Sequence, residues 1–154
     1  MADDIEGLRT VAQYQFGTHA GSALFSNPEE LSLTRTSSGR PRQIHAPDGR
    51  IATYGTDGRF RLGVEGGRRL QRGIDGYRVV VGDESEPYVR DGRNVFAKFV
   101  QTADERIRPR DEVLVEHENG ALLAVGRAEL SGHGMLDFGT GMAVFVREAV
   151  PNEE

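Results

Sequence analysis

Cysteine is absent from this 154-residue chain, and lysine occurs only once, as Lys98. Without cysteine there is neither a disulfide framework nor a thiolate metal site. Histidine is scarce and scattered, without the spacing of a zinc site. The four histidines are His19, His45, His117 and His133. We therefore expect no metal and no cofactor.

Long apolar runs are also absent. None approaches the roughly 20 apolar residues that a membrane-spanning helix needs. The N-terminal stretch MADDIEG is acidic, whereas a secretory signal begins with basic residues. With 37% hydrophobic residues over 154 positions, the chain can form one ordinary domain or two small ones. We expect a folded, soluble and cytoplasmic protein.

Acidic residues outnumber basic ones by 24 to 19, which gives a formal net charge of -5. The balance is uneven, because residues 35–78 hold ten arginines and only four acidic residues. A basic segment in an acidic protein indicates a polyanionic partner such as nucleic acid, and a merely solvated surface is the alternative. The scarcity of lysine fits either a halophilic source or a high-GC genome, and the sequence leaves both open.

The first half of the chain predicts a helix followed by a small sheet. Apolar residues at helical spacing over 5–12, preceded by two aspartates suited to capping, predict a short amphipathic helix. Gly17 and Gly21 then interrupt regular structure. Four short segments separated by SSG, APDG and GTDG predict an antiparallel meander. These segments are 31–35, 40–45, 51–54 and 60–64. GGRRLQRG predicts a helical turn, and GIDG at 73–76 marks a domain boundary.

The second half predicts a small barrel. It opens with the strand YRVVVG, followed by a helix over 86–91 with Pro87 in its first turn and an extended segment over 95–100. The turn Asn119-Gly120 predicts a hairpin, and Gly126 predicts a bulge or a close backbone approach. SGHGMLDFGTG is expected to be a glycine-rich connection to the last strand, MAVFVREAV. Five or six short strands with one helix near the start describe a mostly antiparallel barrel.

Several of these segments carry a resemblance. VRDGRNVFAKFV, RPRDEVLV, LLAVGRA and GMAVFVR follow one another as in a PUA domain, the RNA-binding pseudobarrel of pseudouridine synthases and archaeosine transglycosylases. Glycine is common in that family where this chain has Arg110. LRTVAQYQFGTHAGSALF resembles the patch-forming module that precedes the PUA domain in archaeal tRNA-guanine transglycosylases. The resemblance thus covers both halves of the chain.

The resemblance implies an α+β chain made of two modules and a tail. Residues 1–76 would form the small patch-forming α+β module, 77–150 the mostly antiparallel PUA pseudobarrel, and 151–154 a tail. The large catalytic barrel of the transglycosylases has no counterpart in this sequence. We therefore expect a free-standing RNA-binding protein and not an enzyme, with tRNA as its RNA and an RNA-modification enzyme as its partner.

The family also implies an RNA-facing surface along the glycine loop, the neighbouring helix and the final strand. Its members in this chain are Arg90, Gly92, Arg93, Asn94, Lys98 and Arg147. Arginines of the first module are candidates for a second phosphate patch. They are Arg40, Arg42, Arg68 and Arg69. In the transglycosylases the PUA domain engages the acceptor stem, so a stem with a single-stranded end is the expected ligand.

Each assignment has a plainer alternative. Phe96 and Phe99 are expected in the core and not in stacking, because they lie in an apolar run. Packing is likewise expected for Tyr14 and Phe16. Gly92 can simply end a helix, the lysine can simply point into solvent, and the last arginine can pair with a carboxylate. The acidic second half also fits a different class of function, a protein-interaction or assembly module with a PUA fold and little RNA affinity.

Overall fold

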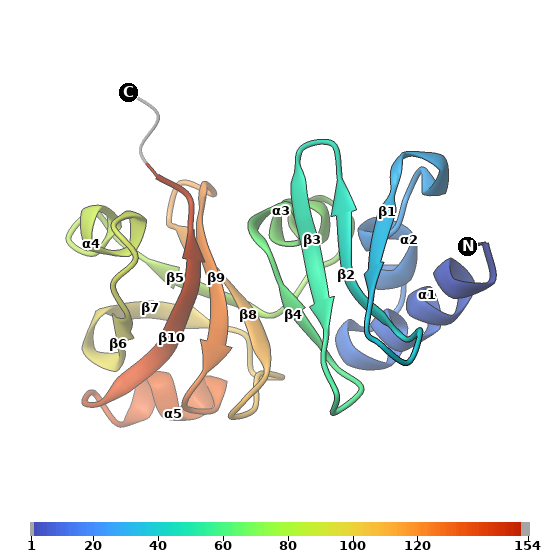
Figure 1. Ribbon diagram of the computed structural model, residues 1–154. Helices are drawn as coiled ribbons and strands as arrows, with labels where there is room; N and C mark the ends of the chain where they lie inside the picture. Colours follow the sequence, from blue (N-terminus) through green and yellow to red (C-terminus); the bar gives the residue numbers. More distant parts are fainter. Residues whose placement is uncertain (1, 152–154) are drawn as a thin grey trace. The chain divides into compact units, whose positions relative to one another are not determined.

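The structure is a computed structural model that describes residues 2–151, so the predicted tail lies, apart from its first residue, outside the described residues. The chain divides between Asp75 and Gly76 into two compact units, which Figure 1 shows in colours that follow the sequence. Among the described residues no helix is both long enough and apolar enough to cross a membrane.

The first unit combines three α-helices and one 3-10 helix with a four-stranded antiparallel sheet. Its helices are α1 (Ala2–Phe16), α2 (Ala20–Leu24), the 3-10 helix η1 (Pro28–Glu30) and α3 (Val64–Gly73). Its strands are β1 (Ser32–Arg35), β2 (Pro41–Ala46), β3 (Gly49–Tyr54) and β4 (Phe60–Leu62). The strands pair in the order β1-β2-β3-β4, so the predicted meander is confirmed.

The helices of this unit are longer and less interrupted than predicted. α1 ends where Gly17 adopts a φ of 99°, and both aspartates lie in its first turn, where negative charge favours the helix N-terminus. Gly21 lies inside α2. Its lack of a Cβ lets α2 approach α1, because a Cβ there would stand 2.5 Å from the carbonyl oxygen of Arg9. The predicted turn GGRRLQRG is part of the ten-residue α3. Gly21 thus allows close packing of α2 on α1, whereas Gly17 ends α1.

The core of the first unit takes buried side chains from its helices and from its sheet. Ile5, Phe16 and Phe60 are at most 3% exposed. The Gln15 side chain bridges α1 to β4, since it accepts from the backbone N–H of Phe60 at 2.7 Å and donates to its carbonyl at 2.9 Å. Packing was the right prediction for Phe16 but the wrong one for Tyr14, which is 89% exposed.

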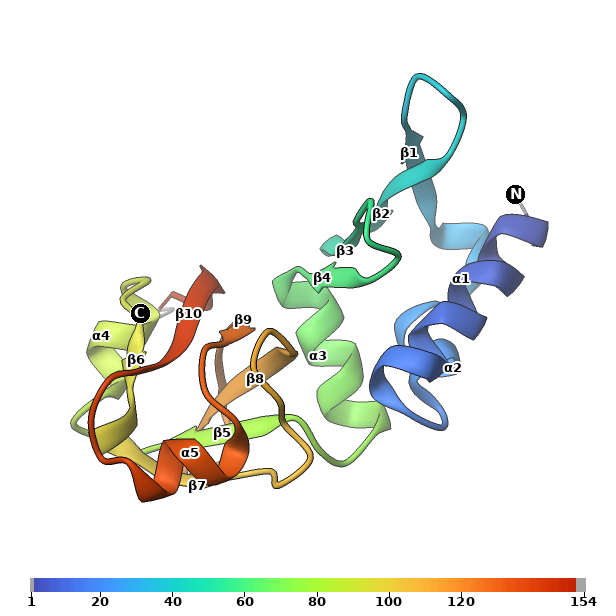
Figure 2. The same cartoon turned by 90° about the horizontal axis from the view of Figure 1, so that it is seen from below.

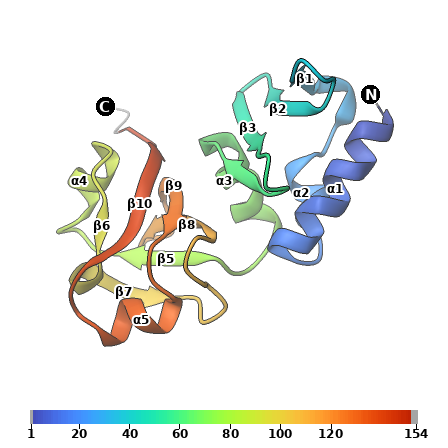
Figure 3. The ribbon, with the colours of Figure 1, turned by 60° about the horizontal axis from the view of Figure 1, so that its bottom comes forward.

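The second unit is built on a six-stranded sheet. Its strands are β5 (Arg78–Val81), β6 (Val95–Phe96), β7 (Val100–Ala103), β8 (Glu112–His117), β9 (Leu122–Ala128) and β10 (Met142–Ala149). Its helices are α4 (Glu86–Arg90), the 3-10 helix η2 (Ala97–Phe99) and α5 (Gly132–Asp137). The strand order is β6-β10-β9-β8-β5-β7, and only the β5–β8 pair is parallel (Figures 2 and 3). The mostly antiparallel barrel is confirmed.

A core of small and branched side chains fills this barrel. Val79, Val113, Val115 and Val144 are fully buried in it, and Met135 of α5 joins them. The close approach predicted at Gly126 is confirmed, because a Cβ there would lie 2.2 Å from the carbonyl oxygen of Phe145 on β10.

One prediction for this unit was incomplete and one was wrong. SGHGMLDFGTG connects β9 to β10 as predicted, but it also contains the unpredicted helix α5, which Ser131 caps by accepting a hydrogen bond from the backbone N–H of Gly134 at 3.0 Å. The segment 95–100 is not one extended element. It forms the two-residue strand β6, one turn of 3-10 helix and the start of β7, so the chain changes direction within six residues.

Candidate functional site

A hollow of about 460 Å³ opens beside α4, β6 and η2 in the second unit. Its lining combines aromatic, apolar and polar side chains from residues 84–99. The lining residues are Glu84, Ser85, Tyr88, Val89, Arg93, Asn94, Val95, Phe96 and Phe99. Four of the ten residues predicted to face RNA lie in or directly beside this lining, namely Gly92, Arg93, Asn94 and Lys98.

Three aromatic rings of the hollow are open to solvent. Tyr88 is 59% exposed, Phe96 47% and Phe99 36%. The expectation that Phe96 and Phe99 belong to the core is therefore wrong. The reason is local, since Val95 takes the inward position of β6 and strand alternation turns its neighbour outward, while Ala97 is the buried residue of η2. Exposed rings clustered around a hollow form a surface on which bases can stack.

The end of α4 fixes one wall of the hollow. The backbone N–H of Gly92 donates to the carbonyl of Val89 at 2.9 Å, and that of Arg93 donates to the carbonyl of Tyr88 at 3.0 Å. This is a Schellman motif, and it requires the left-handed φ of 90° that Gly92 supplies. Gly92 therefore ends the helix, and the motif turns Arg93 back so that its guanidinium lies 5.9 Å from the ring centroid of Tyr88.

Two cations stand at the hollow without a strong internal partner. The Arg93 side chain is 69% exposed, and its nearest carboxylate, Asp91, is 3.9 Å away. Lys98 is exposed, its Nζ lies 5.1 Å from the ring centroid of Phe99, and within residues 2–151 it has no ion pair. Both cations thus lie beside an aromatic ring, so they can contact phosphates next to a stacked base.

Asn94 has a structural contact. Its Oδ1 accepts a hydrogen bond from the backbone N–H of Val146 at 2.9 Å, which ties the segment before β6 to β10. Because the side-chain amide also carries two donor hydrogens, Asn94 can fix the wall of the hollow and still donate to a ligand.

Three of the predicted RNA-facing arginines are engaged within the fold. Arg147 forms a bidentate ion pair with Glu112, and Arg90 donates to Glu86 and to the carbonyl of Val150, both at 3.0 Å. In the first unit Arg69 is 9% exposed and donates to Glu65 at 2.9 Å. These guanidinium groups have their partners already, so we leave them out of the RNA surface proposed below.

The other arginines predicted in the first unit differ in their freedom. Arg40 stacks on Tyr54, with its guanidinium carbon 4.5 Å from the ring centroid, and donates to the carbonyl of Gly55. Arg42 is exposed on β2, and Arg68 is half-buried on α3. Neither has a side-chain hydrogen bond or ion pair to any residue from 2 to 151. Arg42 and Arg68 remain the available cations of the predicted patch.

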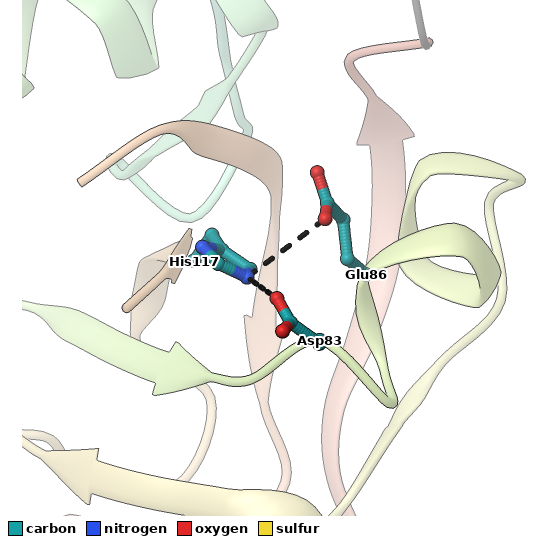
Figure 4. Close-up of side chains that lie close together, drawn as sticks. All are labelled: Asp83, Glu86 and His117. Carbon is teal, nitrogen blue, oxygen red and sulfur yellow. Dashed lines mark hydrogen bonds and ion pairs between the residues drawn. The ribbon is translucent and has the colours of Figure 1, made fainter. Parts of the chain in front are cut away.

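A second polar cluster lies close to the start of α4 and was missed by the sequence analysis. Figure 4 shows the ring of His117, at the end of β8, directed toward the carboxylates of Asp83 and Glu86. Its Nε2 lies 2.6 Å from Asp83 and 3.8 Å from Glu86, and its side chain is only 7% exposed. The hydrogen bond to Asp83 raises the pKa of His117 and outweighs the opposing effect of burial. No spacing in the sequence reveals this cluster, because β8 approaches the loop after β5 only through their parallel pairing.

These three side chains offer nitrogen and oxygen ligands for a divalent cation, with ligand atoms within 4.8 Å of one another. Their geometry, however, is that of direct hydrogen bonding. The backbone N–H of Asn119 donates to Nδ1 at 3.0 Å, so the neutral ring keeps its proton on Nε2 and donates it to Asp83. A metal ion at Nε2 would have to displace Asp83 and move the ring proton to Nδ1. We therefore interpret the cluster as a set of polar contacts that fixes the start of α4.

Comparison with known families separates the same two parts. Residues 6–76 match the family described as the patch-forming domain C2 of tRNA-guanine transglycosylase, and residues 77–150 match the PUA domain family. The tRNA-guanine(15) transglycosylase of Pyrococcus furiosus is 44% identical over 150 residues, which is 96% of this chain and 25% of that protein. The corresponding protein of Methanothermobacter thermautotrophicus is 43% identical over 149 residues, 95% of this chain and 23% of that protein. The chain thus spans about a quarter of the curated relatives it matches.

Solved structures show the same fold. A hypothetical protein from Pyrococcus horikoshii superposes with a TM-score of 0.72 at 23% identity, and the match covers 99% of this chain and 93% of that protein. A conserved PUA domain protein from Thermoplasma acidophilum gives a TM-score of 0.54 at 21% identity over 83% of this chain and 76% of its own. The match to the Pyrococcus horikoshii structure thus shows a shared fold in both units of the chain.

Proposed function

Since this chain consists of a patch-forming C2 domain followed by a PUA domain, we propose that it binds structured RNA through the hollow of its second unit. The ligand is tRNA or a tRNA-like stem, engaged at the acceptor stem and its single-stranded end. The chain supplies recognition, and a separate modification enzyme supplies the chemistry. The relatives that share both modules are transglycosylases of tRNA, which supports this choice of ligand.

The main observation in support of the proposal is the combination of exposed rings and exposed cations. Tyr88, Phe96 and Phe99 offer faces for unpaired bases, and stacking of this kind contributes about 1 to 3 kcal/mol per base. Arg93 and Lys98 stand beside two of these rings and can neutralise the phosphates that flank a stacked base. Shape, stacking and phosphate contacts are the means by which proteins recognise RNA stems with single-stranded ends.

The acidity of the chain makes these two cations more important. With a net charge of -5, the protein repels RNA at long range. At 0.15 M salt the screening length is about 8 Å, so short-range contacts decide binding. A local patch with two exposed cations therefore suffices only if stacking and shape contribute as well. Arg42 and Arg68 are separate candidates for phosphate contacts in the first unit.

The test is a titration of fluorescently labelled tRNA at several potassium chloride concentrations. We compare the wild type with Arg93→Glu and Lys98→Glu, which reverse one charge each at the hollow. Arg127→Glu is the matched control, because Arg127 lies on β9 of the same unit, is paired with Glu129 and lines no wall of the hollow. We expect each hollow variant to weaken binding by at least tenfold at 0.1 M salt and the control to change it less than threefold, since each reversal removes one phosphate contact.

The position on the RNA needs a separate measurement. A minihelix of the acceptor stem with its single-stranded end should compete with full tRNA, whereas the same minihelix trimmed to a blunt end should compete at least tenfold less well. Equal competition by both minihelices would place the contact on the duplex and not on the end.

The alternative is a protein-interaction or assembly module with little RNA affinity, which the exposed rings of the hollow also permit. One simple binding measurement distinguishes the two functions. An assembly module would show no saturable tRNA binding at any salt concentration, and Tyr88→Ala would then weaken association with its protein partner. Absence of tRNA binding by the wild type at 0.1 M salt would overturn the RNA proposal.

A further inference from the structure

The turn that leads into β8 has a residue that does not suit its geometry. The backbone N–H of Asp111 donates to the carbonyl of Arg108 at 3.0 Å, which closes a four-residue turn. Pro109 occupies the second position, and Arg110 in the third position has a φ of 79°. This is the geometry of a type II turn, whose third position strongly favours glycine. Arg110 therefore adopts a left-handed backbone where glycine would be free of strain.

The rest of the turn is well supported, so the strain is confined to one residue. The side chain of Asp111 accepts from the backbone N–H of Arg108 at 2.9 Å, and the backbone N–H of Arg110 donates to the carbonyl of Ala128 on β9 at 2.7 Å. None of these contacts uses the Arg110 side chain. Glycine at this position would keep all of them and remove the strain.

What the strained residue provides is a solvent-facing guanidinium group. Arg108 and Arg110 are both exposed. In the part of the chain that the structure describes, neither guanidinium has a hydrogen bond or an ion pair. This contrasts with Arg147 and Arg90 in the same unit, which are held by carboxylates. Two unpaired cations thus flank one proline in an acidic protein.

We propose that the turn Arg108–Asp111 is a second phosphate-binding element of the same unit, with Arg110 kept at a strained position for the RNA contact. The inference rests on the proposed RNA function and adds a surface outside the hollow. Its ligand is the sugar-phosphate backbone of a duplex, because the turn offers two cations and no aromatic ring for a base. A contact of this kind positions the RNA without reading its sequence.

The decisive variant is Arg110→Gly, because strain and binding predict opposite changes. Relief of the left-handed strain should raise the melting temperature by about 4 to 8 °C. Loss of one phosphate contact should weaken tRNA binding by roughly tenfold at 0.1 M salt, and should reduce the slope of log affinity against log salt concentration by about 1. A more stable protein that binds RNA less well is the expected result.

Two further variants separate charge from backbone. Arg110→Lys keeps the cation and the strain, so the melting temperature should stay within about 1 °C of the wild type and tRNA affinity within about threefold. Arg108→Gln removes the neighbouring cation without touching the strained position, so it should lower the salt slope by about 1 at an unchanged melting temperature.

The outcomes distinguish this inference from the function on which it rests. If the wild type binds no tRNA, the proposed function itself fails. If the wild type binds and the hollow variants weaken binding, but Arg110→Gly retains wild-type affinity and salt slope, only the role of the turn is overturned. A melting temperature that does not rise in Arg110→Gly also overturns it, because the strain would then be no larger than the backbone entropy that glycine costs, and function would have no excess strain to explain.

Discussion

The guanidinium of Arg147 on β10 and the carboxylate of Glu112 on β8 form a bidentate ion pair across β9, with both N–O distances 2.6 Å. The Glu112 side chain is only 5% exposed, and that of Arg147 is 26% exposed. Sequence resemblance assigns Arg147 to RNA, and its carboxylate partner instead gives it a structural role in the sheet.

Arg147→Met should therefore destabilise the protein more than it affects binding. Removal of the guanidinium leaves a buried carboxylate without its cation, which should lower the free energy of unfolding by about 3 kcal/mol. Urea denaturation measures this change, and tRNA affinity of the folded variant should stay within about threefold. The double variant Glu112→Gln/Arg147→Met should recover part of the loss, because no charge is then left buried. A stable Arg147→Met protein with much weaker RNA binding would restore Arg147 to the RNA surface.

Substitution of an aromatic ring in the hollow should affect RNA binding differently from substitution of a cation. Tyr88→Ala removes a neutral stacking surface that is 59% exposed, so it should weaken tRNA binding by about tenfold or more and leave the salt slope unchanged. Tyr14→Ala is the control, since Tyr14 is an even more exposed tyrosine on α1 of the first unit. Fluorescence anisotropy at several salt concentrations measures both quantities. Equal losses in the two variants would mean that the hollow has no special role.

Asp104 should make the stability of the second unit sensitive to acid. Burial acts to raise its pKa, but hydrogen bonds from the backbone N–H groups of Tyr77 and Arg106, together with the guanidinium of Arg106, hold the pKa of Asp104 below its ordinary value of 3.8. The folded state thus binds a proton at Asp104 less readily than the unfolded state does. The resulting stabilisation is complete above the ordinary pKa and is lost as the pH falls through the lower folded-state pKa.

Asp104→Asn should remove this acid dependence. The variant should be less stable than the wild type at pH 7, by about 1 to 3 kcal/mol, because the charged hydrogen-bond acceptor is gone. The difference should shrink steadily as the pH falls below about 4. Urea denaturation from pH 7 to pH 2.5 provides the measurement. A constant difference over that range would show that the carboxylate charge contributes nothing.

One methyl group added at Gly126 should lower the stability of the protein. A Cβ at this position would meet the carbonyl oxygen of Phe145 at 2.2 Å, so Gly126→Ala must push β9 and β10 apart and should destabilise the protein by about 1 to 3 kcal/mol or more. Gly7→Ala is the matched control, because Gly7 lies inside α1 with nothing within 4 Å of the added Cβ. That change should instead stabilise the protein by about 0.5 to 1 kcal/mol. Thermal unfolding distinguishes the two directions.

Local patterns in the sequence predicted most of the fold, because each element has a local cause. Turn residues at regular intervals delimit β1 to β4, Pro87 marks the start of α4, and Asn119-Gly120 marks a hairpin. α5 was missed because its glycines suggested a loop, whereas the Ser131 cap and packing stabilise a short helix. Glycine content is therefore a weak indicator when a cap is present.

The site was harder to predict, because it depends on which way each side chain points and on ion-pair partners that are distant in the sequence. The sequence places Phe96 and Phe99 in an apolar run, but only the two-residue length of β6 and the turn of η2 direct their rings outward. Likewise, nothing local to Arg147 shows that a carboxylate 35 residues earlier is its partner. Arg93 and Lys98, which the family resemblance assigns to the RNA-facing surface, are exposed, and their contact with RNA stays a prediction.

The parallel pairing of β5 with β8 has a consequence for how the protein is made. Val79 of β5 lies opposite Val115 of β8, so this edge of the first strand of the second unit stays open until the arrival of a segment that leaves the ribosome 36 residues later. The meander of the first unit, by contrast, joins neighbours in the chain and can form as it emerges. Pairings between distant segments slow folding and leave strand edges open in the meantime. We expect the two units to acquire structure in sequence during synthesis, with β6 as the strand that waits longest, because its partner β10 begins only at Met142.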